Sequence, residues 1–436
     1  MFELSYGAIA AVTFSAIMIL ILARIPIAMV FFIVGVFGFT FLLPKPMLNQ
    51  LGPSVWRILD SFPLTAVIPF LLMGEFMLQG KISEELYNTL EKWLNRLPGG
   101  LAQVNIVACA IFAAMSGSSV STAATMGVIA GPEMENRGYH NKLTYGTLAA
   151  GGTLGILIPP SIPLIIYGAL TSTSIGQLFM AGIIPGVLIT FLFMVISVFW
   201  VVTIPGTAPR LTEVVSWKEK VAALWGFLPV AILIFVILGG IYGGVVTPTE
   251  AATVGAVAAF FLVIFKGRMN WEVLKSSLHS TILVSSMSYM ILAGSSLINF
   301  LFTFTQVPLL LSEYVAKLSV SPSVVLLLVC LMYLVLGMFI DGISMVVLTV
   351  PAIVPLLTQQ GYDPVWVGII IVLMIELALI TPPVGINLYI LQGISRTASF
   401  SQIATGIIPF AVVIGFMVFV LTLFPQIALW LPETMK

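Results

Sequence analysis

Apolar stretches of roughly twenty residues recur along the whole chain, separated by short polar segments. A helix of that length crosses the hydrocarbon core of a bilayer, so the pattern predicts an all-α polytopic membrane protein. A β-barrel would instead show alternating segments of about ten residues. Uninterrupted spans are predicted at 6–23, 27–43, 62–78, 181–202, 221–242, 249–265 and 283–300, with a C-terminal span within 399–436.

One polar segment has a helical period of its own. Ile82, Leu86, Leu90 and Leu94 recur every four residues between charged positions. This spacing predicts an amphipathic helix over 81–96, lying along the membrane surface.

Two apolar runs are interrupted by proline pairs. Pro159-Pro160 interrupts the run 143–171, and Pro382-Pro383 interrupts its later counterpart. Each proline removes a backbone donor and breaks the helix. In lipid, a broken helix persists only where protein, water or a bound ion satisfies the freed carbonyls. We call residues 155–161 the first break and residues 378–385 the second break.

Two pairs of half-length apolar runs meet at small or polar residues. The runs 101–115 and 122–132 meet at 116–121, which we call the first tip. The runs 324–339 and 343–357 meet at 340–342, the second tip. Half-length runs around such a tip predict re-entrant helical hairpins, which are tolerated where protein shields the tip.

The second half of the chain echoes the first at an offset of 223 positions. This offset aligns Pro159 with Pro382 and the first tip with the second, which predicts an internal duplication. A cytoplasmic connection near 204–220 places thirteen of the seventeen Lys and Arg residues inside. An odd number of crossings then separates the hairpins, so the repeats are predicted to be inverted, with about ten to twelve membrane segments in all.

Composition narrows the class further. Only 8% of residues are charged, the mean hydropathy is +1.15 and the formal net charge is +0. A chain of this kind has the lipid bilayer as its surroundings, and no nucleic-acid partner is indicated. No metalloprotease, serine-hydrolase or metal-spaced Cys/His pattern is present, so an enzyme is not predicted.

Each tip and its break form a candidate site. Freed carbonyls and hydroxyls suit a hard cation such as Na⁺, whereas helix N-termini suit an anion. Simple helix packing by Gly and Ser is the alternative interpretation. In the second site Asp341 stands where the first tip has Ser118, and a carboxylate at membrane depth suggests function. Asp341 could instead only cap the helix that follows it.

Four motifs carry a resemblance to a known family. They are Ser116-Gly117-Ser118-Ser119, Gly155 to Ser161, the stretch from Gly240 to Ala252, and Thr381 to Tyr389. Together they resemble the large, DctM-like membrane subunit of tripartite ATP-independent periplasmic (TRAP) transporters. The resemblance implies an elevator-type, Na⁺-coupled importer of C4-dicarboxylates or related organic acids in the bacterial inner membrane, with no other metal or cofactor.

The resemblance also implies partners and residue roles. A small four-helix membrane subunit, expected as a separate chain, and a periplasmic solute-binding protein would complete the transporter. The implied Na⁺ ligands are Ser116, Gly117, Ser119, Gly155 and Pro159 in one site and Gly337, Gly342, Thr381 and Val384 in the other. The residues expected at or near the substrate are Ser118, Ser161, Asp341 and Asn387.

The chain is therefore predicted to divide into transport and scaffold parts. The transport parts are 99–180 and 321–398, and the scaffold parts are 1–98 and 181–320, followed by the C-terminal span 399–436. The main alternatives are a channel, although no span shows a polar stripe, and an organic-anion transporter that works without a binding protein.

Overall fold

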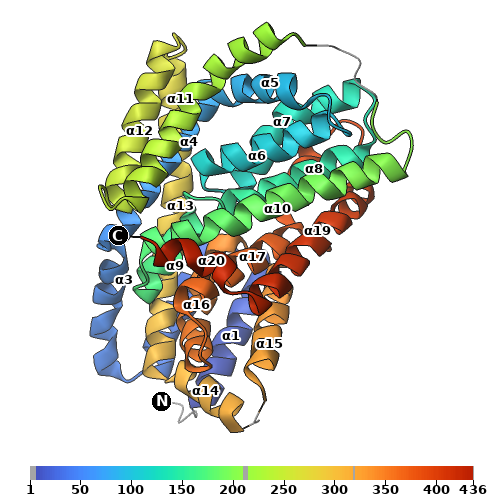
Figure 1. Cartoon of the computed structure of the whole chain (residues 1–436). Helices are drawn as coiled ribbons and strands as arrows, with labels where there is room; N and C mark the ends of the chain where they lie inside the picture. Colours follow the sequence, from blue (N-terminus) through green and yellow to red (C-terminus); the bar gives the residue numbers. More distant parts are fainter. Residues whose placement is uncertain (1–5, 210–214, 318–319, 436) are drawn as a thin grey trace.

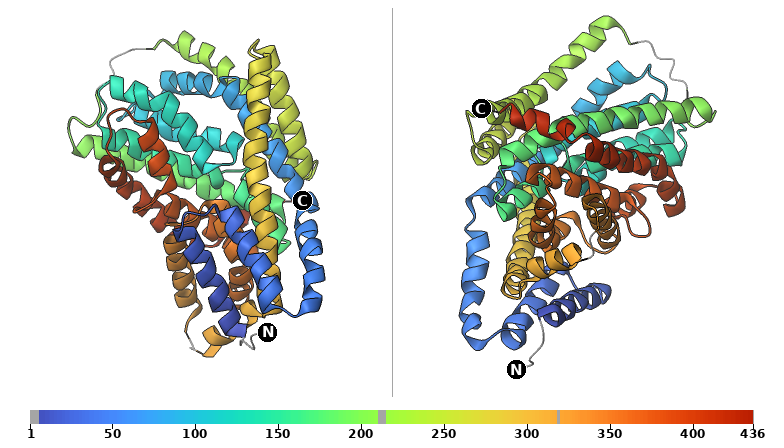
Figure 2. Two further views of the ribbon diagram at one scale, coloured as in Figure 1. Left: turned by 180° about the vertical axis from the view of Figure 1, so that it is seen from behind. Right: turned by 60° about the horizontal axis from the view of Figure 1, so that its bottom comes forward.

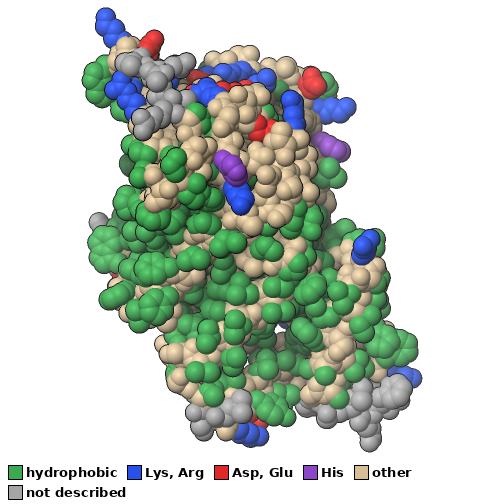
Figure 3. All heavy atoms as spheres, turned by 90° about the vertical axis from the view of Figure 1, so that its right-hand side faces the viewer, with side chains coloured by type: hydrophobic (Ala, Val, Ile, Leu, Met, Phe, Trp, Pro, Cys, Tyr) green, Lys and Arg blue, Asp and Glu red, His purple; other side chains and the backbone are tan. Residues whose placement is uncertain are grey.

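The computed structural model describes residues 6–209, 215–317 and 320–435, and within these ranges it is helical throughout, with no strand. Arg210, in the predicted cytoplasmic connection, lies outside the described residues. Seven of the described helices are long and apolar enough to cross a membrane, namely those at Phe62–Gln79, Ile175–Thr203, Trp217–Tyr242, Pro248–Phe265, Trp271–Phe304, Gly342–Gln359 and Phe400–Leu423. Figure 3 shows one face of this molecule, with a broad hydrophobic band between ends where the charged side chains gather.

The same order of elements occurs twice. Each half contains a two-helix hairpin, a broken helix in two pieces and a long apolar helix. In the first half these are α6 (Leu101–Ser116), α7 (Ser119–Asn136), α8 (Asn141–Thr153), α9 (Ile162–Thr171) and α10 (Ile175–Thr203). In the second half they are α15 (Pro322–Leu336), α16 (Gly342–Gln359), α17 (Pro364–Ile380), α18 (Ile386–Ile394) and α19 (Phe400–Leu423). Both predicted hairpins and both predicted breaks are therefore present.

The first pieces of the two broken helices lie deepest in the protein. Every residue of α8 from Leu143 to Thr153 is buried, and α17 is buried along almost its whole length. Helix α8 packs so closely on α19 that a Cβ at Gly146 would lie 2.5 Å from the carbonyl oxygen of Gly406. The first break, which follows α8, is thus held inside the protein, where its backbone groups can be satisfied, whereas α17 ends at a break whose prolines are exposed.

The two hairpins lie toward opposite ends of the molecule. In Figure 1 the hairpin α6–α7 occupies the upper part and α15–α16 the lower part, and their tips point toward the middle. Figure 2 shows the long helix α13 (Trp271–Phe304) running alongside this body, with α12 (Pro248–Phe265) beside its upper part. The other helices of this side are α1 (Tyr6–Leu22), α2 (Ile27–Phe37), α4 (Val67–Gln79) and α11 (Trp217–Tyr242).

Several predicted bounds were wrong. Helix α13 is far longer than the span expected at 283–300, and α10 begins at Ile175 rather than at 181. The C-terminal span ends at Leu423 and is followed by a separate helix, α20 (Gln426–Glu433), which packs against α10. Two short helices were not predicted at all, namely α3 (Leu51–Leu59) and α14 (Val307–Lys317).

The amphipathic helix is present as α5 (Ile82–Leu94), but its surroundings differ from the prediction. Its apolar residues Ile82 and Leu86 are buried against protein, because α5 packs on α6 and α11. The Glu85 carboxylate accepts a 2.6 Å bond from the Lys266 ammonium, which ties α5 to the end of α12. The apolar face of α5 thus holds helices together, while its predicted position along the membrane surface stays a prediction.

Candidate functional site

Both hairpin tips line one small cavity of about 90 Å³. The sequence suggested a separate site at each tip, yet the structure places residues 117–120 of the first tip opposite Asp341 and Gly342 of the second. Ile156, Ile162 and Pro163 from the first break and its following helix complete one wall. Five of the predicted site residues line this shared space, namely Gly117, Ser118, Ser119, Asp341 and Gly342.

The tips meet because each hairpin packs against the broken helix of the other half. Helix α9, which follows the first break, packs against α16 of the second hairpin, and α18 packs against α7 of the first hairpin. The contact between α7 and α18 is close, since a Cβ at Gly127 would lie 2.7 Å from the Leu391 side chain. Each hairpin arm is therefore held by the broken helix of the other half.

The first tip is bonded to the first break. The Gly117 carbonyl accepts a 3.3 Å bond from the Ile162 backbone N–H. Gly117 has φ +61, and a Cβ there would lie 2.9 Å from the Pro160 carbonyl oxygen, so both conformation and space favour glycine. Pro159 is buried beside this contact. The bond fixes the tip against the break.

A cluster of oxygens lies between the first tip and Gly155. The hydroxyls of Ser116 and Thr122 are 2.8 Å apart, and the Thr122 hydroxyl donates to the Ser118 carbonyl at 2.8 Å. A Cβ at Gly155 would lie 2.6 Å from the Ser118 carbonyl oxygen and 2.7 Å from Thr122 Oγ1. Thr122 is not among the predicted ligands, although it lies one helical turn after Ser118. Hydroxyl and carbonyl oxygens at this spacing are suitable ligands for a hard cation.

Ser161 has a structural role in this conformation. It is fully buried, and its hydroxyl donates a 2.5 Å bond to the Ile156 carbonyl, one of those freed by the break. The same oxygen accepts from the Leu164 N–H, so Ser161 also caps α9. Its hydrogen-bonding groups are therefore occupied within the protein.

Asp341 caps a helix and also lines the cavity. Its carboxylate accepts bonds from the Ile343 and Ser344 backbone N–H groups, at 3.1 and 3.3 Å, and a 2.5 Å bond from the Ser344 hydroxyl. It is thus the N-cap of α16, as Ser118 is of α7. Asp341 also remains partly exposed and lines the cavity, so capping leaves it available there.

The second hairpin approaches α17 closely through two glycines. A Cβ at Gly337 would lie 2.2 Å from the Ala378 Cβ, and one at Gly342 would lie 2.9 Å from the Ile375 side chain. Among the described residues, no hydrogen bond joins the second tip to the second break. The second hairpin is therefore held by packing, whereas the first also has a bond to its break.

The second break is more open than the first. Thr381 donates its hydroxyl to the Leu377 carbonyl at 2.6 Å, and Val384 is partly exposed. Pro382 and Pro383 are exposed, whereas Pro159 and Pro160 are buried. Both proline pairs are joined by cis peptide bonds. Thr381 and Val384 thus lie together at this break, but not in the cavity that both tips line.

Asn387 and Ser119 form a direct bond between the two halves. The Asn387 side-chain amide donates to the Ser119 hydroxyl at 2.6 Å, and both residues are buried. The amide oxygen of Asn387 has no hydrogen-bond partner among the described residues. A buried acceptor without a partner is costly, so this oxygen is suited to receive a bond from a bound molecule or ion.

The cavity carries little charge of its own. Asp341 is its only charged side chain among the described residues, and no Lys or Arg lines it. The N-terminal turns of α7, α9 and α16 reach it through Ser119, Ile162 and Gly342. Helix N-termini carry partial positive charge and favour anions, so this space suits an anion held by backbone dipoles.

Glu135 forms a polar network where α7 ends. Its carboxylate accepts from the hydroxyls of Tyr145 at 2.7 Å, Ser395 at 2.9 Å and Thr397 at 2.8 Å. Partial burial acts to raise the pKa of Glu135, but these bonds outweigh it and hold the pKa below the ordinary value. The network joins the first hairpin to the connection between α18 and α19.

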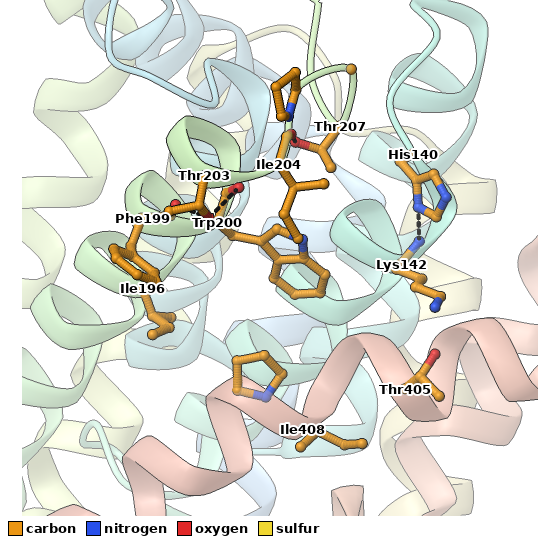
Figure 4. Close-up of a pocket in the computed structure, with 13 residues that line it drawn as sticks. His140, Lys142, Ile196, Phe199, Trp200, Thr203, Ile204, Thr207, Thr405 and Ile408 are labelled. Carbon is orange, nitrogen blue, oxygen red and sulfur yellow. Dashed lines mark hydrogen bonds between the residues drawn. The ribbon is translucent and has the colours of Figure 1, made fainter.

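A roomier groove lies away from the tips. It has a volume of about 600 Å³ and opens between α10, α19 and the start of α8 (Figure 4). Phe199, Trp200 and Ile408 make its walls apolar, and His140 Nδ1 accepts from the Lys142 backbone N–H as a helix cap. No break or tip reaches it, so we place the chemistry at the smaller cavity where helix ends converge.

The sequence of this chain matches a known protein family. A family model described as "Tripartite ATP-independent periplasmic transporter, DctM component" matches residues 14–427. The chain is 35% identical to a C4-dicarboxylate TRAP transporter large permease protein of Pseudomonas aeruginosa, covering 90% of this chain and 92% of that protein. It is also 35% identical to a sialic acid TRAP transporter large permease protein of Vibrio cholerae, covering 86% and 87%.

One further relative and one solved structure extend the comparison. An isethionate TRAP transporter permease protein of Oleidesulfovibrio alaskensis is 31% identical, covering 88% of this chain and 60% of that protein. Among solved structures, the YdaH transporter of Alcanivorax borkumensis has a TM-score of 0.63 at 14% identity, with 89% of each chain covered. At that identity the likeness concerns the fold alone.

Proposed function

Because the chain belongs to the DctM family of tripartite ATP-independent periplasmic transporters, we propose that it imports organic acids by coupling to an ion, most simply Na⁺. It is a multi-pass membrane protein of a family whose relatives are transporter permeases rather than enzymes. The observation that carries the proposal is the meeting of both hairpin tips at one small, partly open cavity that three helix N-termini reach.

The proposed cargo is an organic anion bearing a carboxylate. Two of the relatives above are named for carboxylic acids, a C4-dicarboxylate and sialic acid, and the third is named for isethionate, an organic acid whose anionic group is a sulfonate. The N-termini of α7, α9 and α16 would bind the acid group in place of a basic side chain. Ser118 and Asp341, which line the cavity, would contact polar groups elsewhere on the substrate, and Asn387, which does not line it, would act through its bond to Ser119.

Na⁺ is proposed as the coupling ion because hydroxyl and carbonyl oxygens gather between the first tip and Gly155. Ser116, Ser118, Thr122 and Gly155 would frame one site. The carbonyl oxygens freed near Gly337, Gly342, Thr381 and Val384 would frame the other, and Gly117, Ser119 and Pro159 would support the first. A cation beside the cavity also offsets the repulsion between Asp341 and an anionic substrate.

The proposed mechanism is an elevator. Segments 99–180 and 321–398 would move as one transport unit, which is supported by the way each hairpin packs on the broken helix of the other half. The long helices α11, α12 and α13 would form the scaffold. Hairpins that enter from opposite ends are what inverted repeats would produce, and such repeats give alternating access to one site.

The proposed partners follow from the tripartite family. A small membrane subunit and a periplasmic substrate-binding protein would complete the transporter in the bacterial inner membrane. The test is uptake of a radiolabelled C4-dicarboxylate into proteoliposomes holding the complete transporter. Uptake that needs both an inward Na⁺ gradient and the binding protein is expected. Flux that equilibrates without either one would contradict the proposal and favour a channel.

If the proteoliposomes take up a different organic acid under the same requirements, the proposed mechanism stands and only the proposed cargo changes. A keto acid or sialic acid that competes with the labelled dicarboxylate, or replaces it, would identify that class. The competition series also separates selectivity of this chain from selectivity of the binding protein, if it is repeated with binding proteins of different specificity.

A further inference from the structure

Glu376 is a buried carboxyl group to which the proposed function assigns no role. It lies in α17, five residues before Thr381 of the second break. None of its surface is exposed. Neither carboxyl oxygen has a hydrogen-bond partner among the described residues. A carboxylate in this position would be desolvated and unpaired, which is the most costly arrangement for such a group.

The equivalent position of the first half shows what an ordinary structural residue does there. At the offset of 223, Glu376 corresponds to Thr153. Thr153 is also fully buried, but its hydroxyl donates a 2.7 Å bond to the Ala150 carbonyl, one turn earlier. The Thr153 hydroxyl thus has a hydrogen-bond partner within its own helix, whereas the Glu376 carboxyl group has none among the described residues. The carboxyl group is therefore not needed for packing at this depth.

No neighbouring helix supplies a counter-charge. The helices packed on α17 include α10, α16 and α19, whose described residues carry no charged side chain. The titratable groups of the other packed helices are bonded elsewhere or form no bond or ion pair with Glu376. They are Cys330 and Tyr333 in α15, Tyr145 with Lys142 in α8, Tyr167 in α9, Tyr389 in α18 and Glu433 in α20, together with Asp341, which caps α16.

We propose that Glu376 binds a proton that is carried with the substrate in each transport cycle, a proposal that rests on the transport function given above. In the conformation described here the side chain is a neutral carboxylic acid. A proton is the one cation that a single unpaired carboxyl group can bind without further ligands. Ionisable groups at membrane depth commonly serve as proton relays, which is the role assigned here.

The position of Glu376 provides a route for release. A Cβ built at Gly342 of the second tip would lie 2.9 Å from the Ile375 side chain and 3.9 Å from that of Leu379, so movement of that hairpin changes the packing beside Glu376. The second break is already exposed at Pro382 and Pro383. Water entering there would accept the proton: the carboxyl O–H bond breaks, its electron pair remains on the oxygen, and hydronium forms. The reverse transfer on the opposite side of the membrane restores the acid.

The protonation state can be measured without transport. Infrared difference spectra of the purified, folded chain near neutral pH are expected to contain the C=O band of a protonated carboxyl group, which is lost in Glu376→Gln. Glu313→Gln, at an exposed position of α14, is the control and should retain the band. Spectra in which Glu376→Gln removes only carboxylate bands would overturn the proposal, whether or not the chain transports organic acids.

Transport then tests the coupling. Glutamine resembles the protonated acid but cannot release a proton, so net uptake by Glu376→Gln should fall by roughly tenfold or more. Exchange of internal for external labelled substrate, which needs no release, should stay within about twofold of the Glu313→Gln control. Net uptake equal to the control would overturn the proposal. Loss of both activities in a folded variant would also overturn it and would point to a Na⁺ or substrate ligand.

Discussion

The substitution Gly155→Ala tests whether the oxygen cluster at the first tip binds an ion. Alanine fits the backbone there, since Gly155 does not adopt positive φ. Its Cβ, however, would lie 2.6 Å from the Ser118 carbonyl oxygen and 2.7 Å from Thr122 Oγ1. Ordinary van der Waals contacts of a Cβ begin at about 3.4 Å, so these two oxygens must move away from residue 155 by about 0.7 to 0.8 Å.

A shift of that size exceeds what a cation site tolerates. Coordination distances are held to about 0.2 Å, so the displaced oxygens would no longer bind Na⁺ well. Overpacking in a close-packed interior costs about 1–3 kcal/mol. If that cost falls on the ion-bound form, the affinity for Na⁺ decreases by roughly 5- to 150-fold.

The assay is the Na⁺ dependence of uptake in proteoliposomes, together with thermal unfolding of the purified chain with and without Na⁺. We expect the half-saturating Na⁺ concentration to rise in Gly155→Ala and the stabilisation by Na⁺ to decrease. Gly415→Ala is the matched control, because a Cβ at this position of α19 has no atom within 4 Å. Unchanged Na⁺ dependence in a variant that folds normally would show that this cluster is not an ion site.

Four further predictions concern other contacts. Gly406→Ala places a Cβ 2.2 Å from a backbone oxygen of α8 and should destabilise the chain by about 1–3 kcal/mol, measured by thermal unfolding. Ser119→Ala and Asn387→Ala should be non-additive by about 0.5–3 kcal/mol in a double-mutant cycle of stability, since the residues are bonded; additive losses would contradict the bond. Because the pKa of Glu135 is lowered in the folded state, its carboxylate stabilises the fold at pH values above the unfolded-state pKa. This stabilisation is lost as pH falls through the folded-state pKa. Glu135→Gln should therefore make the melting temperature depend less on pH in the acid range. Asp341→Asn keeps a helix cap but removes the charge, so we expect near-normal stability with strongly reduced uptake; normal uptake would leave capping as its only role.

The breaks and hairpins could be predicted because their signals are local. A proline pair or a Gly/Ser tip interrupts a helix wherever the chain lies, so its position is fixed by the sequence itself. Helix bounds were harder to predict. Hydropathy reports the part of a helix that prefers lipid, and α13 continues past Lys275 and His279 because polar residues also propagate helices. Helix α3 is neither long nor apolar enough to be recognised as a span.

The candidate site could be predicted only in part, for a different reason. The residue types at each tip indicated oxygen ligands, and Ser116, Gly155 and Asp341 do lie beside their breaks or tips. What the sequence could not indicate was that both tips share one cavity. The bond between Ser119 and Asn387 joins residues 268 positions apart, and it depends on how the halves pack rather than on any local pattern.

The two breaks have the same proline pair but different polar residues around it, and this difference accounts for their different exposure. In the first break, Ser161 donates to a freed carbonyl and caps α9. Its counterpart at the offset of 223 is Val384, which can do neither, and α18 begins without a side-chain cap. The second break therefore lacks the bond that closes the first break. The buried carboxyl group of Glu376 lies in α17, the helix that leads into this more open break. The N-cap position of α18 is Gly385, so Val384→Ser cannot supply the cap, but it introduces a hydroxyl that can donate to a freed carbonyl and should thereby bury the second break. If opening of that break limits turnover, Val384→Ser should slow uptake while raising thermal stability; faster uptake would contradict this account of the asymmetry.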